Sequence, residues 1–494
     1  MQKKIVIIGG GISGLATAYS LEERAEREGK SVSITLLEKK NQIGGNILTE
    51  RVGDFLIEGG PDCFLSEKPW AIQLCERLGM RESLLRTNDE FRKTYILWNG
   101  HLYELPEGVI LMIPTEIFPL LKSNLISLSG KIRMGMELFI PKKESSDDES
   151  LSQFVRRRLG QEALDKIAAP LVAGVHAEDP DTMSVKSRFP RFVQMEEEYG
   201  SLIKGMIAKR REMRMAGSKG NKPKYTMFMT LKDGLSEMPA TIVQNLKSTE
   251  ILTNKEVLSV DKVSSNVILS EAKNLNHVVS EAKLMKHKYK VSLKNGEVLD
   301  ADTVVFASPS YETARLLTGI DDSISDLLNK IPYTSTATVS LAFKKDSIFH
   351  PMNGFGFLVP SQEKRRITGA TWVSRKFSYR SPDDSVLIRC FIGGSHNEKL
   401  IFLNDKDMIE MVKRELRDIM GITSEPLLTR IYRWERAMPQ YTIGHEGRLS
   451  ILDKKLSEYP GIFLTGSSYR GSGISECIKD GQLTAESVLK YLNL

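Results

Sequence analysis

An apolar strand that runs directly into glycines constrains this chain more than any other feature. The run Ile5 to Ile8 is followed by GGGISG, residues 9–14, and then by the helical pattern LATAYSLEERAE. Gly9, Gly11 and Gly14 fill a G-x-G-x-x-G pattern, which provides a tight turn, room for a pyrophosphate and close packing of helix on strand. The helix N-terminus then offers N–H groups to phosphates. The sequence therefore predicts a Rossmann-like α/β domain with a dinucleotide site.

An acidic residue and a second glycine pair strengthen this prediction. The strand pattern Ser33 to Leu37 ends in Glu38, 24 residues after Gly14. A carboxylate there is expected to meet a ribose hydroxyl and to repel a 2′-phosphate. The glycine pattern alone is weak evidence, and a glycine-rich turn without a ligand is the alternative. Gly44-Gly45 follows the acid within ten residues, and NAD enzymes do not usually need such a pair.

The end of the chain carries another glycine-rich turn. GIFLTGSSYRGSGISECIKDG, residues 461–481, predicts a short strand, a turn containing Gly466, Gly471 and Gly473, and a helix that begins near Ile474. Glycine is entropically costly, and Ser, Thr, Asp or Asn caps a helix better. We therefore expect a ligand to approach the main chain closely at this turn.

Composition excludes several classes of protein. The 494 residues suffice for two to four domains, and the net charge of +6 is too mild for a typical nucleic-acid binder. The four cysteines form no C-x-x-C and the seven histidines show no ligand spacing, so neither a disulfide scaffold nor a metal site is predicted. No apolar run approaches the roughly 20 residues that a membrane span needs. We expect a cytoplasmic protein, with peripheral contact at the inner face of the cell membrane as an option.

Several motifs resemble one enzyme family over nearly the whole chain. The Gly44-Gly45 pair is similar to that of FAD-containing oxidoreductases of the amine-oxidase superfamily. Within it, the chain resembles the protoporphyrinogen/coproporphyrinogen III oxidase family, and most closely its Gram-positive bacterial branch. The stretches that carry the resemblance are EGGPDCFL (58–65), YILWNGHLYELP (95–106), PLVAGVHAEDPDTMS (170–184), GFGFLVP (354–360) and RWERAMPQYTIGH (433–445).

The resemblance implies an amine-oxidase-like, or p-hydroxybenzoate-hydroxylase-like, α/β architecture of three intermixed domains. The implied divisions are an FAD-binding domain (1–60, 232–308, 447–494), a substrate domain with a mixed sheet (61–80, 180–231, 309–446) and a helical domain at the entrance (81–179), which touches membrane in some members. Asn99-Gly100 predicts a hairpin, and Leu151 to Leu159 and Leu164 to Val172 predict helices. Core packing is the preferred role of four apolar residues that could instead line a porphyrin cavity: Met134, Met136, Leu138 and Phe139.

The resemblance also implies the cofactor contacts. N–H groups of the last glycine turn would face the pyrimidine edge of the flavin, where a helix N-terminus stabilises the negative charge of the reduced ring. Many relatives have Arg or Lys after the glycine pair, where this chain has Asn46. The residues expected to bind FAD are Gly9, Gly10, Gly11, Ile12, Ser13, Gly14, Glu38, Lys39, Gly45, Asn46, Gly60, Pro61, Asp62, Cys63, Val257, Trp434, Gly473, Ile474 and Ser475.

The implied reaction is the oxygen-dependent oxidation of coproporphyrinogen III to coproporphyrin III in haem biosynthesis, and protoporphyrinogen IX is the alternative substrate. In the family, flavin N5 takes a hydride from a bridging carbon, a pyrrole N–H loses a proton, and oxygen is reduced to peroxide. Asp62 is the candidate catalytic residue, or else bonds the backbone beside the flavin. Lys68, Arg92 and Lys93 are candidate propionate ligands, or else solvated surface charges.

Two other functions remain open at this stage: another amine oxidase or carotenoid desaturase, and an FAD-fold binding protein without redox activity. The basic segment Lys204 to Lys224 predicts at most weak, salt-sensitive contact with anionic membranes. The near-repeat NVILSEAKNL and NHVVSEAKLM, residues 266–285, is interpreted as a neutral insertion, with a regulatory role as the alternative. The expected partners are a porphyrinogen and molecular oxygen, without nucleic acid, and the oligomeric state is not predicted.

Overall fold

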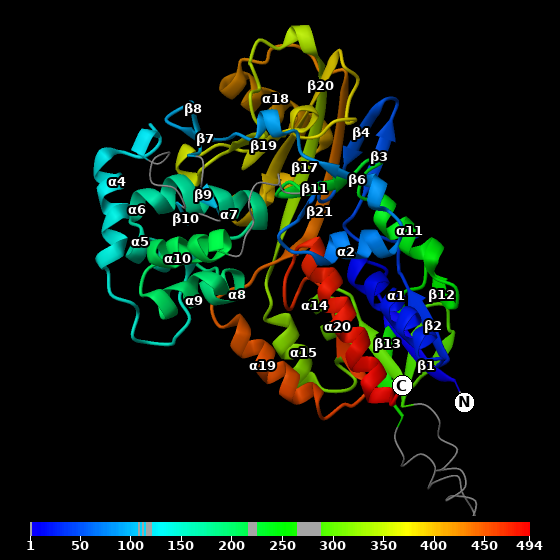
Figure 1. Cartoon of the computed structure of the whole chain (residues 1–494). Coiled ribbons are helices and arrows are strands. Elements are labelled where there is room, and N and C mark those ends of the chain that lie inside the picture. The colour runs from blue at the N-terminus through cyan, green and yellow to red at the C-terminus, as the bar shows by residue number, and fades with distance from the viewer. Residues whose placement is uncertain (1, 107–108, 111–112, 115–120, 216–224, 264–287) are drawn as a thin grey trace, which may run out of the picture.

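Strands from the first and the last part of the chain belong to one parallel sheet. The computed structural model describes all residues except 1, 107–108, 111–112, 115–120, 216–224 and 264–287 (Figure 1). Its five-stranded parallel sheet has the order β12-β2-β1-β16-β22, which confirms the predicted Rossmann-like arrangement. The strands are β12 (Thr249–Leu252), β2 (Val32–Leu37), β1 (Lys3–Ile8), β16 (Thr303–Phe306) and β22 (Ile462–Leu464).

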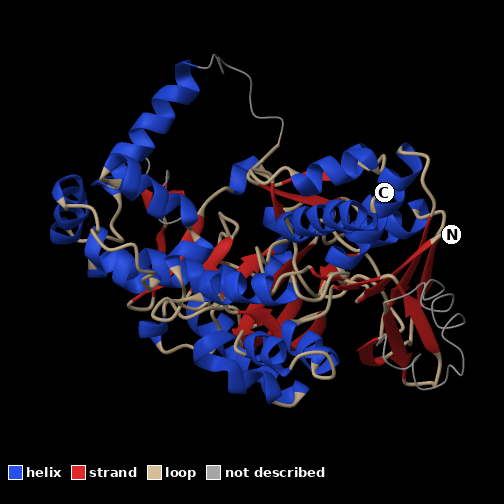
Figure 2. Ribbon diagram, turned by 90° about the horizontal axis from the view of Figure 1, so that it is seen from below, coloured by secondary structure: helices blue, strands red, loops and turns tan. Residues whose placement is uncertain are grey.

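Both faces of this sheet are covered, which explains the continuous apolar runs in its strands. Ile5 and Ile7 of β1 face one apolar core, whereas the alternate residues Val6 and Ile8 face another. Helices α1 (Ile12–Arg27) and α20 (Ile474–Leu492) lie side by side on the first face, with α2 (Trp70–Arg77) and α11 (Glu237–Asn245) (Figure 1). The second face is covered by β13 (Val257–Lys262), β14 (Tyr289–Leu293), β15 (Val298–Ala301), α14 (Ser310–Leu317), α15 (Asp322–Asn329) and α19 (His445–Leu456). The chain ends lie near each other in both views (Figure 2).

A seven-stranded mixed sheet forms a second layer with its own core. Asn99 and Gly100 adopt positive φ angles of 50° and 75° and close the predicted hairpin. This hairpin was expected within the helical segment 81–179, but it extends the mixed sheet, because β7 (Thr94–Trp98) pairs in parallel with β18 (Gly356–Leu358). Helix α18 (Asp405–Met420) packs its apolar side on the sheet. The strand order is β21 (Leu428–Pro439), β17 (Tyr333–Lys344), β20 (Ser385–Gly393), β19 (Gly369–Trp372), β18 (Gly356–Leu358), β7 (Thr94–Trp98) and β8 (His101–Glu104).

A group of helices lies at one side of the two sheets (Figure 1). The helix predicted over Leu151 to Leu159 is confirmed as α5, and Ser150 caps it in a capping box with Gln153. The second predicted helix begins as a π-turn, Leu164–Ala168, and continues as α7. These helices are α4 (Leu128–Gly135), α5 (Leu151–Arg158), α6 (Gln161–Ala163), α7 (Ala169–His176), α8 (Val185–Arg188), α9 (Pro190–Tyr199) and α10 (Leu202–Met215).

The core prediction for the four apolar residues of 134–139 is correct for Met134, which is 1% exposed. It is wrong for Met136 and Phe139, which are 53% and 85% exposed, because the apolar side of this helical turn faces outward. Among the residues that the structure describes, no helix is long and apolar enough to span a membrane. The near-repeat of 266–285 and the end of the basic segment 204–224 lie outside the described residues.

Short elements complete the fold. β11 lies between β5 and β6 in a three-stranded sheet, and β3 pairs with β4 in a hairpin that leads into residues 59–63. The bounds are β3 (Thr49–Val52), β4 (Phe55–Glu58), β5 (Phe64–Leu65), β6 (Leu84–Arg86), β9 (Val109–Ile110), β10 (Ile113–Pro114), β11 (Phe228–Leu231), α16 (Val373–Lys376) and α17 (Gly394–Asn397).

Candidate functional site

The first glycine turn connects β1 to α1 and leaves an open space before the helix. A Cβ on Gly14 would lie 2.0 Å from the carbonyl oxygen of Gly9, so only glycine lets the helix come this close. A Cβ on Gly11 would meet nothing nearer than the Cα of Gly45, at 3.9 Å. Gly11 is also the N-cap of α1 and has no side chain to cap it. Uncapped N–H groups therefore face a space that a side chain at Gly11 would fill, which is the arrangement a phosphate needs.

Glu38 and the second glycine pair fix this turn. The carboxylate of Glu38 accepts hydrogen bonds from the N–H of Gly10 at 2.8 Å and from the N–H of Lys40 at 2.9 Å. The N–H of Gly44 donates to the carbonyl of Gly10 at 2.8 Å, so the two glycine stretches lie side by side. Each carboxylate oxygen keeps a further lone pair for a ligand hydroxyl.

The second glycine turn also leads into a helix, but the space beside it is occupied, because a Cβ on Gly473 would lie 2.6 Å from the carboxylate of Glu476. Gly473 is the N-cap of α20, again without a side-chain cap, and is exposed, whereas Ile474 and Ser475 are buried. Ser475 is 1% exposed, and its hydroxyl has no hydrogen-bond partner among the described residues. A buried polar group without a partner is uncommon in native proteins. The two uncapped helix ends and this hydroxyl fit a ligand that carries phosphates and a polar ring.

A third segment, Gly59 to Cys63, is held by side chains from the mixed sheet. Trp434 Nε1 donates to the carbonyl of Gly59 at 2.8 Å. Arg389 Nη2 donates to the carbonyl of Gly60. Lys376 Nζ lies 3.2 and 3.0 Å from the two carboxylate oxygens of Asp62. This segment therefore depends on residues more than 300 positions away in the chain.

The charges around Asp62 decide its protonation state. Burial alone would raise the pKa of Asp62, but Lys376 and Arg389 outweigh it and lower this pKa to about 2. Burial, together with the negative charge of Asp62, raises the pKa of the neighbouring Cys63 thiol to about 12. Burial opposes the charge of Lys376, but Asp62 raises the pKa of this amine. At neutral pH the site therefore holds an ionised Asp62, a protonated Lys376 and a neutral thiol.

Sequence reasoning missed Lys376 and Arg389 because neither belongs to a motif: Lys376 follows Arg375 in a short helix, and Arg389 is an isolated cation in a strand. Of the predicted propionate ligands, Lys68 forms an ion pair with Glu476 in the first turn of α20. Lys93 pairs with Glu104 at 2.7 Å, and Arg92 is exposed. The structure therefore brings only Lys68 to a glycine turn.

Two residues that were predicted to bind the cofactor make contacts within the protein itself. Lys39 lies 3.2 Å from Glu312 in a partly exposed ion pair. Val257 is 5% exposed and belongs to the core beneath the second face of the parallel sheet.

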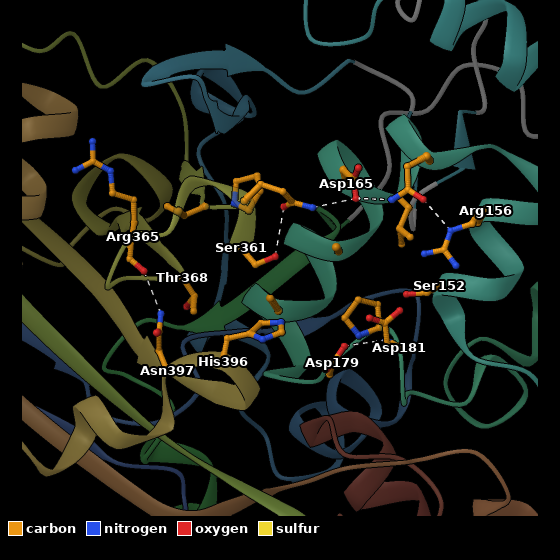
Figure 3. Close-up of a pocket in the computed structure, with 18 of the residues that line it drawn as sticks. Ser152, Arg156, Asp165, Asp179, Asp181, Ser361, Arg365, Thr368, His396 and Asn397 are labelled. Atoms are coloured by element: carbon orange, nitrogen blue, oxygen red, sulfur yellow. Dashed lines mark hydrogen bonds between the residues drawn. The ribbon is translucent and has the colours of Figure 1, made fainter.

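A separate cleft of about 170 Å³ lies between the helices and the mixed sheet (Figure 3). Ser152, Arg156 and Asp165 enter it from the helical side, and Arg365, His396 and Asn397 from the opposite side. Gln362 Nε2 donates to Asp165 at 2.9 Å across it. None of the predicted site residues, all of which the structure describes, lines this cleft.

Comparison with known proteins agrees with this geometry. The flavin containing amine oxidoreductase family matches residues 12–489, a range that begins within the first glycine turn, after Gly11, and includes the segment held by Lys376 and the second glycine turn. The chain belongs to this family. It is 35% identical to the coproporphyrinogen III oxidase of Bacillus subtilis, with 99% of each chain covered, and 28% identical to protoporphyrinogen oxidase 2 of Arabidopsis thaliana, with 99% and 94% covered. A crystal structure from Exiguobacterium sp. 255-15 is 30% identical, with a TM-score of 0.82 over 100% of both chains.

Membership of the flavin containing amine oxidoreductase family confirms the fold class and the resemblance described above. The chain is a flavin-dependent oxidoreductase. A putrescine oxidase structure at 14% identity and a TM-score of 0.66 shows that the same fold extends to distant members.

Proposed function

We propose that this flavoprotein oxidises coproporphyrinogen III to coproporphyrin III with FAD as cofactor and molecular oxygen as acceptor. The observation that carries the proposal is the full-length similarity to coproporphyrinogen III oxidases, at 35% identity in one case and 30% in that of Staphylococcus aureus. The intact glycine turns argue for a working flavin site and against a binding protein without redox activity.

The FAD would extend from one glycine turn to the other. We assign the pyrophosphate to the open space at Gly11, with Gly45 beside it, and the adenosine ribose to the remaining lone pairs of Glu38. The pyrimidine edge of the flavin would meet the N–H groups of α20, with the hydroxyl of Ser475 as a further partner. We also keep the three-domain division given by the sequence as part of this proposal, with the hairpin of 94–104 moved to the mixed sheet.

The flavin would supply the redox chemistry by accepting a hydride from a bridging carbon of the porphyrinogen. Asp62 would orient the substrate by accepting a hydrogen bond from a pyrrole N–H. A group with a pKa of about 2 is a poor general base at neutral pH, because efficient bases have a pKa near the working pH. Asp62 would therefore act as a fixed negative charge that stabilises positive charge developing on the tetrapyrrole.

The substrate assignment is tested by comparing kcat/KM for coproporphyrinogen III and protoporphyrinogen IX, with spontaneous air oxidation subtracted and detergent matched. Coproporphyrinogen carries four propionates and protoporphyrinogen two, and one further charge-assisted contact is worth about 1.5 to 3 kcal/mol. We therefore expect a tenfold to hundredfold preference for coproporphyrinogen III. A ratio at or below one would favour protoporphyrinogen IX, to which the plant relatives point. Replacing Lys68, Arg92 and Lys93 in turn would show which of them holds a propionate.

We further propose a weak peripheral contact with anionic membranes. Leu128, Ile132, Met136 and Phe139 form an apolar stripe at helical spacing, and each is more than half exposed. The exposed Lys142 follows the stripe. Sedimentation with anionic vesicles should fall in a Met136→Ser, Phe139→Ser protein. Binding that is lost at high salt but unchanged in this variant would assign the contact to basic residues instead.

A further inference from the structure

Two stretches far apart in the chain pack against each other beside the second glycine turn. They are Glu178 to Ser184 and Pro439 to His445, and both belong to motifs that resemble the enzyme family. The N–H of Ser184 donates to the carbonyl of Tyr441 at 2.8 Å, and the N–H of Ile443 donates to the carbonyl of Thr182 at 3.0 Å. These bonds join the connection between α7 and α8 to the segment that follows β21.

A buried ion pair fills the junction. Arg188 of α8 pairs with Glu178, and both side chains are less than 5% exposed. The other carboxylate oxygen of Glu178 accepts the N–H of Tyr441 at 3.3 Å. The Arg188 guanidinium lies 3.6 Å from the centre of the Tyr441 ring, and its Nη1 donates to the hydroxyl of Ser472 at 2.9 Å. The ion pair thus holds the Tyr441 ring and also contacts the glycine turn.

The hydroxyl of Tyr441 spans this turn. It donates to the carbonyl of Ser467 at 2.8 Å and accepts the N–H of Gly471 at 2.8 Å. The ring stacks on His445, with centroids 4.0 Å apart, and His445 Nε2 lies 2.9 Å from the carbonyl of Tyr469. Burial lowers the pKa of His445 to about 4, so the ring is neutral and Nε2–H is the donor. Two stacked rings therefore fix three backbone groups between Ser467 and Gly471.

We propose that Tyr441 is a positioning residue that sets the flavin's reduction potential by holding the turn that precedes α20. The proposal rests on the flavin placement given above, in which the N–H groups of residues 473–475 meet the pyrimidine edge. A helix N-terminus stabilises negative charge only at short range, within about its first turn. Loosening the turn would weaken this stabilisation in the reduced state more than in the oxidised state.

The test uses the holoprotein and a Tyr441→Phe variant, which loses one oxygen and keeps both ring contacts. We expect FAD to dissociate about three- to tenfold more readily, as for loss of one or two neutral hydrogen bonds. We also expect a more negative midpoint potential, measured by dye-coupled reduction. Ser472→Ala, which removes only the Arg188 contact, should shift the potential in the same direction by less. A potential equal to that of the unmodified protein in both variants would overturn the proposal.

The matched control is Tyr289→Phe. Tyr289 is also fully buried, and its hydroxyl donates to the carbonyl of Pro460 at 3.1 Å, but it lies in β14. We expect this variant to unfold more readily with an unchanged potential. An equal shift of potential in Tyr289→Phe would mean general loosening and would also overturn the proposal. Because the readout is the potential, an error in the assigned porphyrinogen leaves the result valid, whereas protein that never binds flavin would contradict the proposed function instead.

Discussion

The first glycine turn and the segment Gly59 to Cys63 belong to the same proposed flavin site but are built differently. The turn is fixed by its own backbone and by residues that follow within about 40 positions, such as Glu38 and Gly44. The segment is fixed by two charged side chains and one tryptophan from α16, β20 and β21, which come more than 300 residues later. The first therefore depends on space and backbone geometry, whereas the second depends on electrostatic balance in a buried environment.

This difference determines how a substitution in each region should affect ligand binding and stability. An added methyl group in the turn displaces either a ligand or a backbone atom, with no change in charge. A lost charge near Asp62 leaves the opposite charge buried and unpaired, which costs more than the intact pair contributes. Variants of single residues can separate these two modes.

The largest effect is expected from Lys376→Met. The Asp62 and Lys376 side chains are only 14% and 10% exposed, so the carboxylate would lose its closest cation in a largely buried place; breaking a fully buried pair costs about 3 to 5 kcal/mol, which is the upper bound here. We expect the urea midpoint to fall accordingly, with porphyrinogen oxidation lost.

The control for this variant is the double change Lys376→Met, Asp62→Asn, which removes both charges. It should recover most of the stability but not the activity. If the single and double variants were equally stable, charge balance would not be what holds this segment.

The next effect separates two glycines of the first turn. Gly11→Ala places a methyl group in open space, 3.9 Å from the nearest atom, so folding should be unaffected and FAD affinity should fall. Overpacking of this kind costs about 1 to 3 kcal/mol, or roughly five- to 150-fold in affinity. Gly14→Ala would instead press on the Gly9 carbonyl and lower the unfolding free energy. Flavin titration and urea denaturation of both variants would measure the contrast, and a Gly11→Ala protein with normal affinity would remove the pyrophosphate from this space.

At acid pH, the unfolding free energy should depend on the ionisation of Asp62. Its pKa falls from the usual 3.8 to about 2 on folding, so ionised Asp62 stabilises the fold above pH 3.8, and this contribution is lost as the pH falls toward 2. By linkage it is at most about 2 kcal/mol. Asp62→Asn should flatten the dependence of unfolding free energy on pH in this window and leave it unchanged above pH 5. If the unfolding free energy of the variant fell equally steeply at low pH, other carboxylates would determine this pH dependence.

The same contrast explains what could be predicted from sequence. The first turn could be predicted because its strand, glycines and acid are close together in the chain. Lys376 and Arg389 could not, since only the pairing of β17, β19, β20 and β21 brings them to Gly59–Cys63. Likewise, Asn99-Gly100 predicted a hairpin but not its sheet, because the neighbouring strand β18 comes some 260 residues later.

The helical spacing of apolar residues also predicts only part of the structure. It shows which residues of 128–139 share a side, but it does not show whether that side meets a core or solvent. Met134 packs in the core while Met136 and Phe139 are exposed, and only the position of this turn at the edge of the helical group decides between the two.

The smallest effect is expected from deleting Asn266 to Met285, a segment that carries none of the motifs assigned to either region. The flanking strands β13 and β14 pair with each other between Val257 and Leu293, so a shorter connection can still close this hairpin. Loop-closure entropy changes by only about 0.6 kcal/mol for each doubling of loop length, so removing most of the connection should stabilise the protein by about 1 kcal/mol. FAD affinity, the pH dependence of unfolding free energy at acid pH and porphyrinogen turnover should all match those of the full chain. A deletion protein that folds and binds FAD but turns over slowly would instead give the insertion a regulatory role, acting on the charged segment and not on the glycine turn.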